Sequence, residues 1–338
     1  MLKPIEKKMY LHPGCLQRYT VRFDGNFCHI ESSEHQIFVM SVSVQGNQLR
    51  LVLNPFQSLF NPQVWLSLGL EFLLGHFSEI KLITVVGEDP RLQGLVYQKV
   101  HSSPNEWLIR REDFFQWPWP WQFVKEEKHA FETWTETQNR SHPIRPRFQP
   151  GLFYQRYVAS IDKTLSFRSI DVEKDLAIFH AWHNHPRVYG LWELNKPMEE
   201  LKTYIKNGLN DPHQIPLILE VDGVSIGYFE IYWAKEDRLG PYYESDPYDR
   251  GFHFLIGHPR YLGLNNTRAA VISIMHFIFL NESKTQRIVV EPRSDNQKVL
   301  RYAQEIPGWR FIKEFDFPHK RAALLMAHRN EFFSGEAL

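Results

Sequence analysis

The strongest constraint on the fold is a strand, a glycine-containing turn and a long apolar helix that follow one another in the C-terminal half. Residues 252–257 have the pattern of a strand, and residues 266–280 that of an apolar helix which we expect Asn266 to cap. A second strand pattern follows at 286–291. Strands joined through a helix run parallel, with a right-handed crossover. The pattern therefore predicts a strand–helix–strand unit whose helix covers one face of a sheet.

The flanking segments add antiparallel strands and further helices. Residues 215–221 and 224–233 flank Asp222-Gly223, a dipeptide typical of tight hairpins. The other expected elements are a strand at 166–170, a helix ending near His183, a helix at 197–209, a helix at 296–305 and strands at 308–315 and 322–328. The predicted fold class is α+β, with a mixed, largely antiparallel central sheet flanked by helices.

At 338 residues the chain is long enough for two domains. The N-terminal part reads as an α/β extension, with strands at 36–44, 48–53 and 80–86 and a helix at 62–74. Residues 114–124 mix aromatics with prolines, so we expect them to pack across a domain surface rather than to form a central strand. Because residues 140–151 are rich in proline, we predict an extension at 1–140, a linker at 141–160 and a second domain at 161–333.

The composition excludes several classes of protein. The 39 basic and 39 acidic side chains balance, which argues against a nucleic-acid partner. Two cysteines, Cys15 and Cys28, are too few for a disulfide framework. The apolar run at 271–280 is about half of what a membrane span needs, and the N-terminus has no signal-peptide pattern. We therefore expect a soluble, cytoplasmic protein without a membrane partner.

The turn between the strand at 252–257 and the following helix carries a candidate anion site. Amide N–H groups at a helix N-terminus, exposed by a glycine such as Gly263, bind phosphates, and Arg260 adds positive charge. The plain alternative is an ordinary capped turn. The turn resembles the Arg/Gln-x-x-Gly-x-Gly/Ala motif of GNAT acetyltransferases, with Asn265 in place of the last small residue. That resemblance implies that CoA is bound by Arg260, Gly263, Leu264, Asn265 and, at the start of the next helix, Asn296.

A longer resemblance covers residues 150–333, which are similar to the aerobactin-type N6-hydroxylysine acetyltransferases and, more distantly, to the mycobactin lysine acyltransferases. It rests on RPRFQPGLFYQRY (145–157), NHPRV (184–188), YFEIYWAKEDRLG (228–240), YDRGFHFLIG (248–257), KTQRIVVEPRSDNQ (284–297) and KEFDFPHKR (313–321). The resemblance implies acetyl-CoA as co-substrate and an N-hydroxylated amine as acceptor, in siderophore biosynthesis. It also implies a functional link to a flavin-dependent N-hydroxylase and a siderophore synthetase, and an N-terminal extension that in some members is a degenerate GNAT-like half.

In that family a histidine on the motif strand and a carboxylate on the next parallel strand form the active-site pair. The matching positions are His253 and Glu291, with Glu where the lysine acyltransferases have Asp. A histidine is suited to accept a proton near neutral pH, and a carboxylate to orient its ring. The amides of Leu255, Ile256 and Gly257 are the expected oxyanion donors. The alternative is a core histidine beside a strand-end carboxylate.

Six residues are candidates for the acceptor site. Trp192 and Tyr232, beside Trp233, are suited to wall a slot, and Glu230 or Asp249 to pair with a distal ammonium. Arg250 suits an acceptor carboxylate, a CoA phosphate or an ion pair with Asp249. The plain reading of these residues is core aromatics and surface charge.

His180, His183 and His185 cluster at a helix end without cysteine or carboxylate ligands at metal-site spacing. We therefore expect no metal.

The preferred function is acetyl transfer from acetyl-CoA to N6-hydroxylysine, N-hydroxyputrescine or N-hydroxycadaverine, and the sequence leaves the choice among them open. A second reading is transfer of a longer acyl group such as succinyl, or acylation of a plain amine. A third is a non-catalytic CoA-binding assembly module, for which the aromatic segment 114–124 offers the best support.

Overall fold

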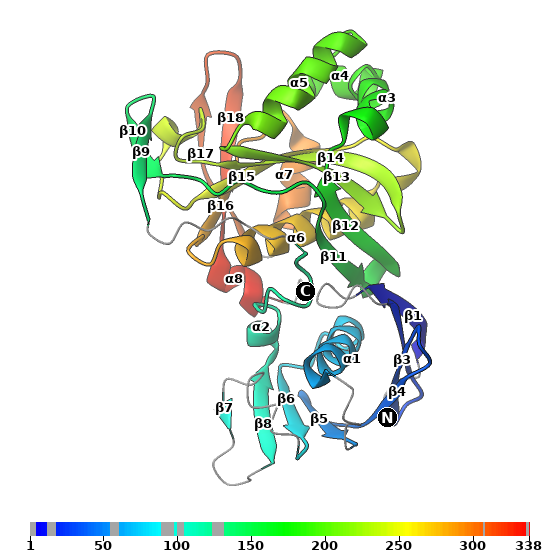
Figure 1. The fold of residues 1–338 in the computed structure, drawn as a ribbon. Coiled ribbons are helices and arrows are strands. Elements are labelled where there is room, and N and C mark those ends of the chain that lie inside the picture. Colours follow the sequence, from blue (N-terminus) through cyan, green and yellow to red (C-terminus); the bar gives the residue numbers. More distant parts are fainter. Residues whose placement is uncertain are drawn as a thin grey trace. The chain divides into compact units, whose positions relative to one another are not determined.

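The computed structural model describes residues 5–11, 18–54, 61–88, 98–99, 105–123, 132–306, 308–335 and 338. Cys15 and the end of the aromatic segment, Val124, lie outside these residues. The chain divides into two compact units (Figure 1). The first comprises residues 1–122, 157–164 and 338, and the second residues 123–156 and 165–337. Within the described residues, no helix combines the length and the apolar character that a membrane crossing requires.

The first unit is built on one sheet with the strand order β1-β2-β3-β4-β5-β6-β8-β7. Its strands are β1 (Ile5–Leu11), β2 (Arg18–Phe23), β3 (Phe27–Ser32), β4 (Ile37–Gln45), β5 (Gln48–Leu53), β6 (Leu82–Val86), β7 (Gln98–Lys99) and β8 (Glu106–Arg110), and its helices are α1 (Pro62–His76), α2 (Arg111–Phe114) and the short η2 (Ala159–Ile161). The strands predicted at 36–44, 48–53 and 80–86 and the helix at 62–74 are confirmed within two residues at each end. Asn61 caps α1, with its side chain accepting the Gln63 N–H at 3.0 Å.

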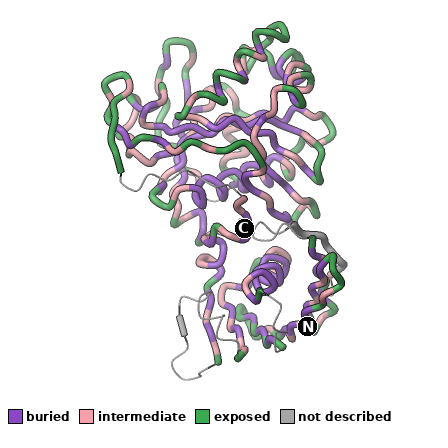
Figure 2. Tube along the Cα trace, viewed as in Figure 1, coloured by how far each residue is buried: buried purple, intermediate pink, exposed green. Residues whose placement is uncertain are grey.

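The second unit contains a sheet with the order β11-β12-β13-β14-β15-β16-β18-β17. Its strands are β11 (Leu152–Val158), β12 (Lys163–Ser169), β13 (Gln214–Val221), β14 (Val224–Trp233), β15 (Arg250–Ile256), β16 (Arg287–Val290), β17 (Trp309–Asp316) and β18 (Arg321–His328), and a separate hairpin is formed by β9 (Trp134–Thr137) and β10 (Arg140–Pro143). The helices are α3 (Val172–His183), α4 (Pro186–Trp192), α5 (Met198–Asn210), η3 (Gly240–Tyr242), η4 (Pro259–Tyr261), α6 (Leu264–Asn281), α7 (Gln297–Gln304) and α8 (Arg329–Ser334). Helices α3–α5 lie over one face of this sheet and α6 lies on the other, and buried residues follow the strands between them (Figures 1 and 2). The predicted α+β class is confirmed.

Two predicted local features of this unit have clear outcomes. The hairpin at Asp222-Gly223 is confirmed: both residues have positive φ, 49° and 78°, and Val221 pairs with Val224. The predicted start of the long helix is wrong. Helix α6 begins at Leu264 and its N-cap is Gly263, whose φ of 126° suits glycine, so Asn266 lies inside the first turn instead of capping it.

Strands β15 and β16 separate soon after they pair. Their parallel pairing covers Arg250 with Ile288 and Gly251 with Val289, whereas β15 continues to Ile256 paired with β14 alone. One edge of β15 is therefore left without a strand neighbour beyond Gly251.

The sheet of the first unit has the same strand connectivity as that of the second, but its parallel strands do not separate. Its parallel pair, β5 and β6, is also joined by a helix, and its last two strands are again exchanged in the sheet order. However, β5 and β6 stay paired from Gln48 to Val52. The two sheets therefore share one connectivity, and in the first unit the parallel strands stay paired.

The aromatic segment before residue 124 is buried rather than spread over a surface. Phe114, Phe115 and Trp121 are at most 1% exposed. Their rings contact one another at centroid distances of 5.2–5.6 Å. They are core residues of the first unit, which removes the main support for a surface-displayed assembly module.

The proline-rich segment at 140–151 is packed within the second unit. It begins with β10, and Arg145 forms a buried bidentate ion pair with Glu236 at 2.5 and 2.7 Å. The Arg145 guanidinium also donates to the Pro247 carbonyl oxygen at 2.7 Å and stacks 4.0 Å above the Trp233 ring. The segment thereby holds the loop that runs from residue 234 to residue 249.

Candidate active site

His253 lies in the middle of β15, on the face of the sheet that α3–α5 cover. Across the β14–β15 pair, His253 is opposite Glu230 and Gly251 is opposite Tyr232. Side chains alternate between the two faces along a strand, so Tyr228, Glu230, Tyr232 and His253 point to the same side. The sheet register therefore collects these four polar side chains.

The His253 ring is held between two carboxylates. Its Nδ1 atom lies 3.2 Å from Oε2 of Glu230, and its Nε2 atom lies 3.1 Å from Oε1 of Glu291. The carboxylate side chains are 8% and 1% exposed, whereas the ring is 29% exposed. An ionised carboxylate only accepts hydrogen bonds, so two such neighbours favour a ring that carries a proton on both nitrogens.

The electrostatics of the cluster favour the same protonation state. Burial lowers the pKa of His253, but the charge of Glu291 and the hydrogen bonds to both carboxylates outweigh it and raise the pKa to about 10. Burial would raise the pKa of Glu230 and of Glu291, but their interactions with His253 hold both pKa values below the ordinary range. The two carboxylates thus favour an imidazolium at neutral pH, whereas the proton acceptor that we expected from the sequence needs a neutral ring.

Three tyrosine hydroxyls donate hydrogen bonds to the carboxylate oxygens that do not face His253. The hydroxyls of Tyr228, at 3.0 Å, and of Tyr204 on α5 donate to Oε1 of Glu230. The hydroxyl of Tyr232 donates to Oε2 of Glu291 at 2.7 Å. Burial raises the pKa of each tyrosine, so all three stay protonated donors. Each carboxylate is thus fixed with one oxygen facing the His253 ring.

The structure brings together some of the predicted acceptor residues and separates others. Glu230 and Tyr232 belong to the His253 cluster, and the Trp192 ring stands 6.3 Å from that of His253. Trp233 and Arg250 point to the opposite face. There the Arg250 guanidinium is fully buried, stacks 3.9 Å above Trp233 and donates to Asn281 of α6 at 3.2 Å. These two residues pack the core behind the sheet.

Asp249 also has a structural setting. Its carboxylate accepts hydrogen bonds from Arg287, at 2.7 and 2.9 Å, and from the Tyr243 hydroxyl at 2.9 Å. Its side chain is 1% exposed. This carboxylate is therefore committed to an internal ion pair, away from His253.

Only one of the three predicted oxyanion donors faces the gap beside β15. The Gly257 N–H donates to the Ile226 carbonyl oxygen of β14 at 2.8 Å. Because backbone groups alternate along a strand, the Leu255 N–H points to the same side, and the Ile256 N–H points to the edge that β16 has left. Ile256 is thus the residue of the three whose amide faces this edge.

Arg187 on α4 holds the end of β15 and was not singled out from the sequence. Its Nη2 atom donates to the carbonyl oxygens of Ile256, at 2.9 Å, and of Gly257, at 3.0 Å. It lies within the NHPRV segment, but no local pattern indicates a partner some 70 residues away.

The candidate phosphate-binding turn is exposed at the start of α6. Arg260, Gly263 and Asn265 are exposed, and Leu264 is half-buried. The 18-residue helix that follows places its first amides at this point. Asn296 caps α7, accepting the Val299 N–H at 3.3 Å, so its side chain has a structural role.

Two of the three histidines considered for a metal, His183 and His185, use a ring nitrogen in other contacts. His183 is buried, its Nδ1 atom contacts the Phe179 carbonyl oxygen at 2.9 Å, and burial lowers its pKa. His185 caps α4, accepting the Arg187 N–H at 3.1 Å. His180 lies on α3, and the Asn184 side chain donates to its carbonyl oxygen at 3.1 Å.

Elsewhere in the described part of the chain, His142, His213 and Glu236 place ligand atoms within 4.8 Å of one another. Both oxygens of Glu236 already accept from Arg145, and both ring nitrogens of His142 are hydrogen-bonded, to Pro143 at 2.8 Å and Thr137 at 2.9 Å. The ligand atoms of His142 and Glu236 are thus already used in contacts within the protein, which makes the cluster a poor site for a metal ion.

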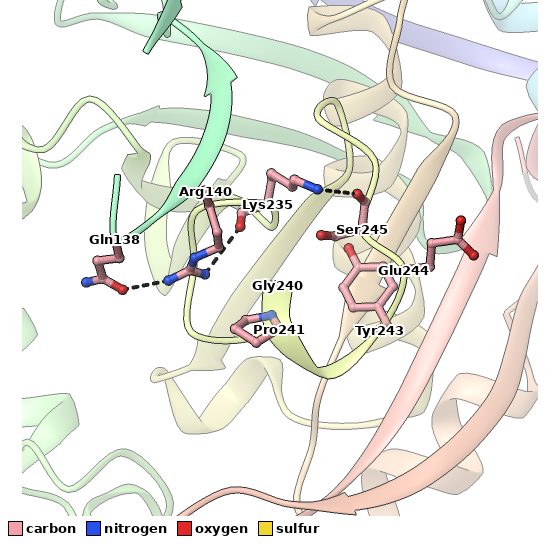
Figure 3. Close-up of a pocket in the computed structure, with 8 residues that line it drawn as sticks. All are labelled: Gln138, Arg140, Lys235, Gly240, Pro241, Tyr243, Glu244 and Ser245. Atoms are coloured by element: carbon pink, nitrogen blue, oxygen red, sulfur yellow. Dashed lines mark hydrogen bonds between the residues drawn. The ribbon is translucent and has the colours of Figure 1, made fainter. Parts of the chain in front are cut away.

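A separate shallow cavity of about 410 Å³ lies beside the 234–249 loop (Figure 3). Its lining residues are Gln138, Arg140, Lys235, Gly240, Pro241, Tyr243, Glu244 and Ser245. His253 is not among them. Arg140, which lines the cavity, donates to the carbonyl oxygen of Lys235 (Figure 3) and to that of Asp237, so the cavity marks where the β9–β10 hairpin supports this loop.

Comparisons with known proteins agree with the fold. Residues 171–317 match the family described as acetyltransferase (GNAT) domain. The chain is 39% identical over 228 residues to an N(6)-hydroxylysine O-acetyltransferase of Escherichia coli, covering 67% of this chain and 72% of that one. It is 37% identical to a putative lysine N-acyltransferase of Schizosaccharomyces pombe, covering 67% of each.

A third relative is an N(5)-hydroxyornithine:cis-anhydromevalonyl coenzyme A-N(5)-transacylase of Beauveria bassiana, 40% identical over 58% of this chain and 44% of that one. Among solved structures, an uncharacterised protein of Bacillus halodurans aligns with 56% of this chain and 97% of its own, at 31% identity and a TM-score of 0.52. The opened β15–β16 pair, the helix-start turn and these matches together identify the chain as a member of the GNAT acyltransferases related to N6-hydroxylysine O-acetyltransferase.

Proposed function

We propose that the protein transfers an acetyl group from acetyl-CoA to the nitrogen of an N-hydroxylated amine and so forms a hydroxamate for siderophore biosynthesis. The observation that carries the proposal is the His253 ring, held between Glu230 and Glu291 on the strand whose edge opens beside β16. The relatives from E. coli and B. bassiana are named for acyl transfer involving N-hydroxylated amino acids.

The donor is expected to lie in the gap between β15 and β16. The first amides of α6 and the guanidinium of Arg260 would hold the diphosphate of CoA. The thioester carbonyl would then reach the Ile256 N–H, which supports the oxyanion as the tetrahedral intermediate forms. In the first unit β5 and β6 leave no such gap, which supports a non-catalytic role for that unit.

The protonation state of the cluster suggests how the proton moves. An N-hydroxylamine is weakly basic and enters neutral. Once its nitrogen attacks the thioester carbon, the attached N–H becomes acidic enough for an ionised carboxylate, Glu291, to accept the proton. The C–S bond breaks, the His253 imidazolium gives a proton to the leaving sulfur, and Glu291 returns one to the ring. The net transfer is one proton from nitrogen to sulfur.

A longer acyl group is the second candidate for the donor, because the B. bassiana relative is named for an anhydromevalonyl donor. Purified protein incubated with acetyl-, succinyl- or a branched acyl-CoA and one N-hydroxylated amine would rank the donors by free thiol released. Acetyl-CoA should give the highest kcat/KM.

The same thiol assay tests the main proposal with acetyl-CoA and N6-hydroxylysine, N-hydroxyputrescine or N-hydroxycadaverine, and with lysine as the non-hydroxylated comparison. At least one hydroxylated amine should release thiol much faster than lysine, with a hydroxamate as product. Absence of turnover with every hydroxylated amine would end the proposal. The proposed reaction also implies a flavin-dependent N-hydroxylase that supplies the acceptor and a siderophore synthetase that consumes the product. We propose that all three enzymes act in the cytoplasm.

A further inference from the structure

Two cationic side chains converge on Glu291 beside His253. The Nη2 atom of Arg238 lies 3.4 Å from Oε1 of Glu291, the oxygen that Nε2 of His253 contacts at 3.1 Å. The Nζ atom of Lys320 lies 3.8 Å from the same oxygen and donates to the Glu291 carbonyl oxygen at 2.8 Å. The imidazole and the Arg238 guanidinium are therefore within the reach of one small molecule.

Arg238 is not required to satisfy Glu291. That carboxylate already accepts hydrogen bonds from His253 and, at 2.7 Å, from the Tyr232 hydroxyl. The Arg238 side chain is 50% exposed, and the hydrogen bond that the structure gives it in the described chain is the single long contact to Glu291. A guanidinium has five N–H donors, so this one contact uses only a small part of its capacity.

The position of Arg238 is prepared by its surroundings. Its guanidinium lies 5.7 Å from the Phe317 ring, over which Lys320 also lies at 5.5 Å. Arg140 holds the loop before it by donating to the carbonyl oxygen of Lys235 (Figure 3) and to that of Asp237. A cation on a supported loop loses less conformational entropy when it binds an anion.

The cations lie at the opposite end of β15 from the phosphate turn. Arg238 follows the end of β14, where Trp233 pairs with Arg250, the first residue of β15. The turn at Gly263 follows the last residue of β15. The anion that Arg238 meets is therefore different from the diphosphate of CoA.

We infer that Arg238, with Lys320 beside it, binds the carboxylate of the acceptor, so that the substrate is an N-hydroxylated amino acid rather than a decarboxylated N-hydroxydiamine. The inference rests on the proposed function and makes its acceptor class more specific. An arginine suits this role because its planar fork matches a carboxylate.

The decisive comparison uses N6-hydroxylysine and N-hydroxycadaverine, which differ by the carboxylate alone. Wild-type protein should prefer the amino acid. The Arg238→Gln variant should lower kcat/KM for N6-hydroxylysine about 10- to 100-fold, mainly through KM, because a hydrogen bond between charged groups is lost. Any change in kcat through the contact between Arg238 and Glu291 is shared by both substrates, so the ratio of the two kcat/KM values reports the acceptor carboxylate alone. Arg238→Lys should recover part of the loss in that ratio.

The matched control is Arg321→Gln, which removes the same charge from the residue next to Lys320. Arg321 pairs with Glu314 and Asp316 in an exposed position, so neither substrate should be affected. Equal losses with both substrates in Arg238→Gln would overturn the inference, as would a wild-type enzyme that uses N-hydroxycadaverine equally well; either result leaves the proposed function standing. Failure of the wild type with every hydroxylated amine would remove both.

Discussion

Glu230 lies directly opposite His253 across the β14–β15 pair, and its Oε2 atom is 3.2 Å from Nδ1 of the ring. The hydroxyls of Tyr204 and Tyr228 hold the other oxygen of this carboxylate. A residue that the sequence suggested as a partner for the acceptor's ammonium thus contacts the candidate catalytic ring. Its arrangement makes it a positioning residue that acts through His253.

Replacing Glu230 with Gln removes one negative charge and nearly preserves the shape. The imidazolium is then less stabilised, so the pKa of His253 should fall from about 10 toward its ordinary value. We expect kcat to fall about 10- to 100-fold with little change in the KM for acetyl-CoA. NMR titration of the imidazole would follow the pKa directly. An unchanged His253 pKa would show that Glu230 does not act through the ring. Tyr204→Phe keeps the charge of Glu230 and should therefore not lower the pKa of His253.

Replacing His253 with Gln should remove catalysis while leaving the donor site intact. The group that protonates the leaving sulfur is lost, and kcat should fall about 10²- to 10⁴-fold. CoA should still bind, because the α6 turn is separate from the ring, and calorimetry would measure this. The variant also removes a cation from between two buried carboxylates, so thermal unfolding should be recorded alongside. Retained kcat in a folded variant would exclude His253 from the chemistry.

The pH dependence of kcat separates an imidazolium from a neutral base. With a raised pKa of about 10, His253 keeps its proton through neutral pH, so kcat should be nearly constant from about pH 7 to pH 9 and should fall above that. The stabilisation from its ion pairs has the same sign: it is fully present below the unfolded pKa of about 6.5 and is lost as the pH rises through the folded value. A kcat that rises through pH 6.5 with saturating substrates would instead indicate a base with an ordinary pKa.

Much of the local structure could be predicted from the sequence. Which residues meet in the candidate site depends on the register of the paired strands, which could not be predicted. Asp222-Gly223 predicts its hairpin because few residues accept positive φ in succession. The pairing of Glu230 with His253 was not predictable, because 16 residues without a fixed turn geometry separate β14 from β15. The burial of Trp233 on the face opposite His253 could be predicted, because side chains alternate along a strand and its neighbour Tyr232 lies on the His253 face. No sequence pattern indicated the ion pair of Asp249 with Arg287.

Gly251 tests how tightly Tyr232 must be held against Glu291. A Cβ atom at this position would lie 2.2 Å from Cζ of Tyr232 and 2.4 Å from its hydroxyl oxygen. Gly251→Ala should therefore displace the ring, remove the hydrogen bond to Glu291 and lower kcat by about tenfold. Gly190→Ala on α4 is the control, because a Cβ there meets nothing within 4 Å. Wild-type activity in folded Gly251→Ala would mean that this hydrogen bond is dispensable.

The buried ion pair between Arg145 and Glu236 connects the proline-rich segment to the loop that carries Arg238. Both side chains are at most 1% exposed, so Arg145→Met leaves an unpaired buried carboxylate and should cost about 3–5 kcal/mol in the free energy of unfolding. Urea denaturation would measure this loss. The double variant Arg145→Met/Glu236→Gln should regain part of it, because the stranded charge is gone. If Arg145→Met is as stable as wild type, residues 140–151 do not hold the loop, and the support that we assign to Arg238 fails with it.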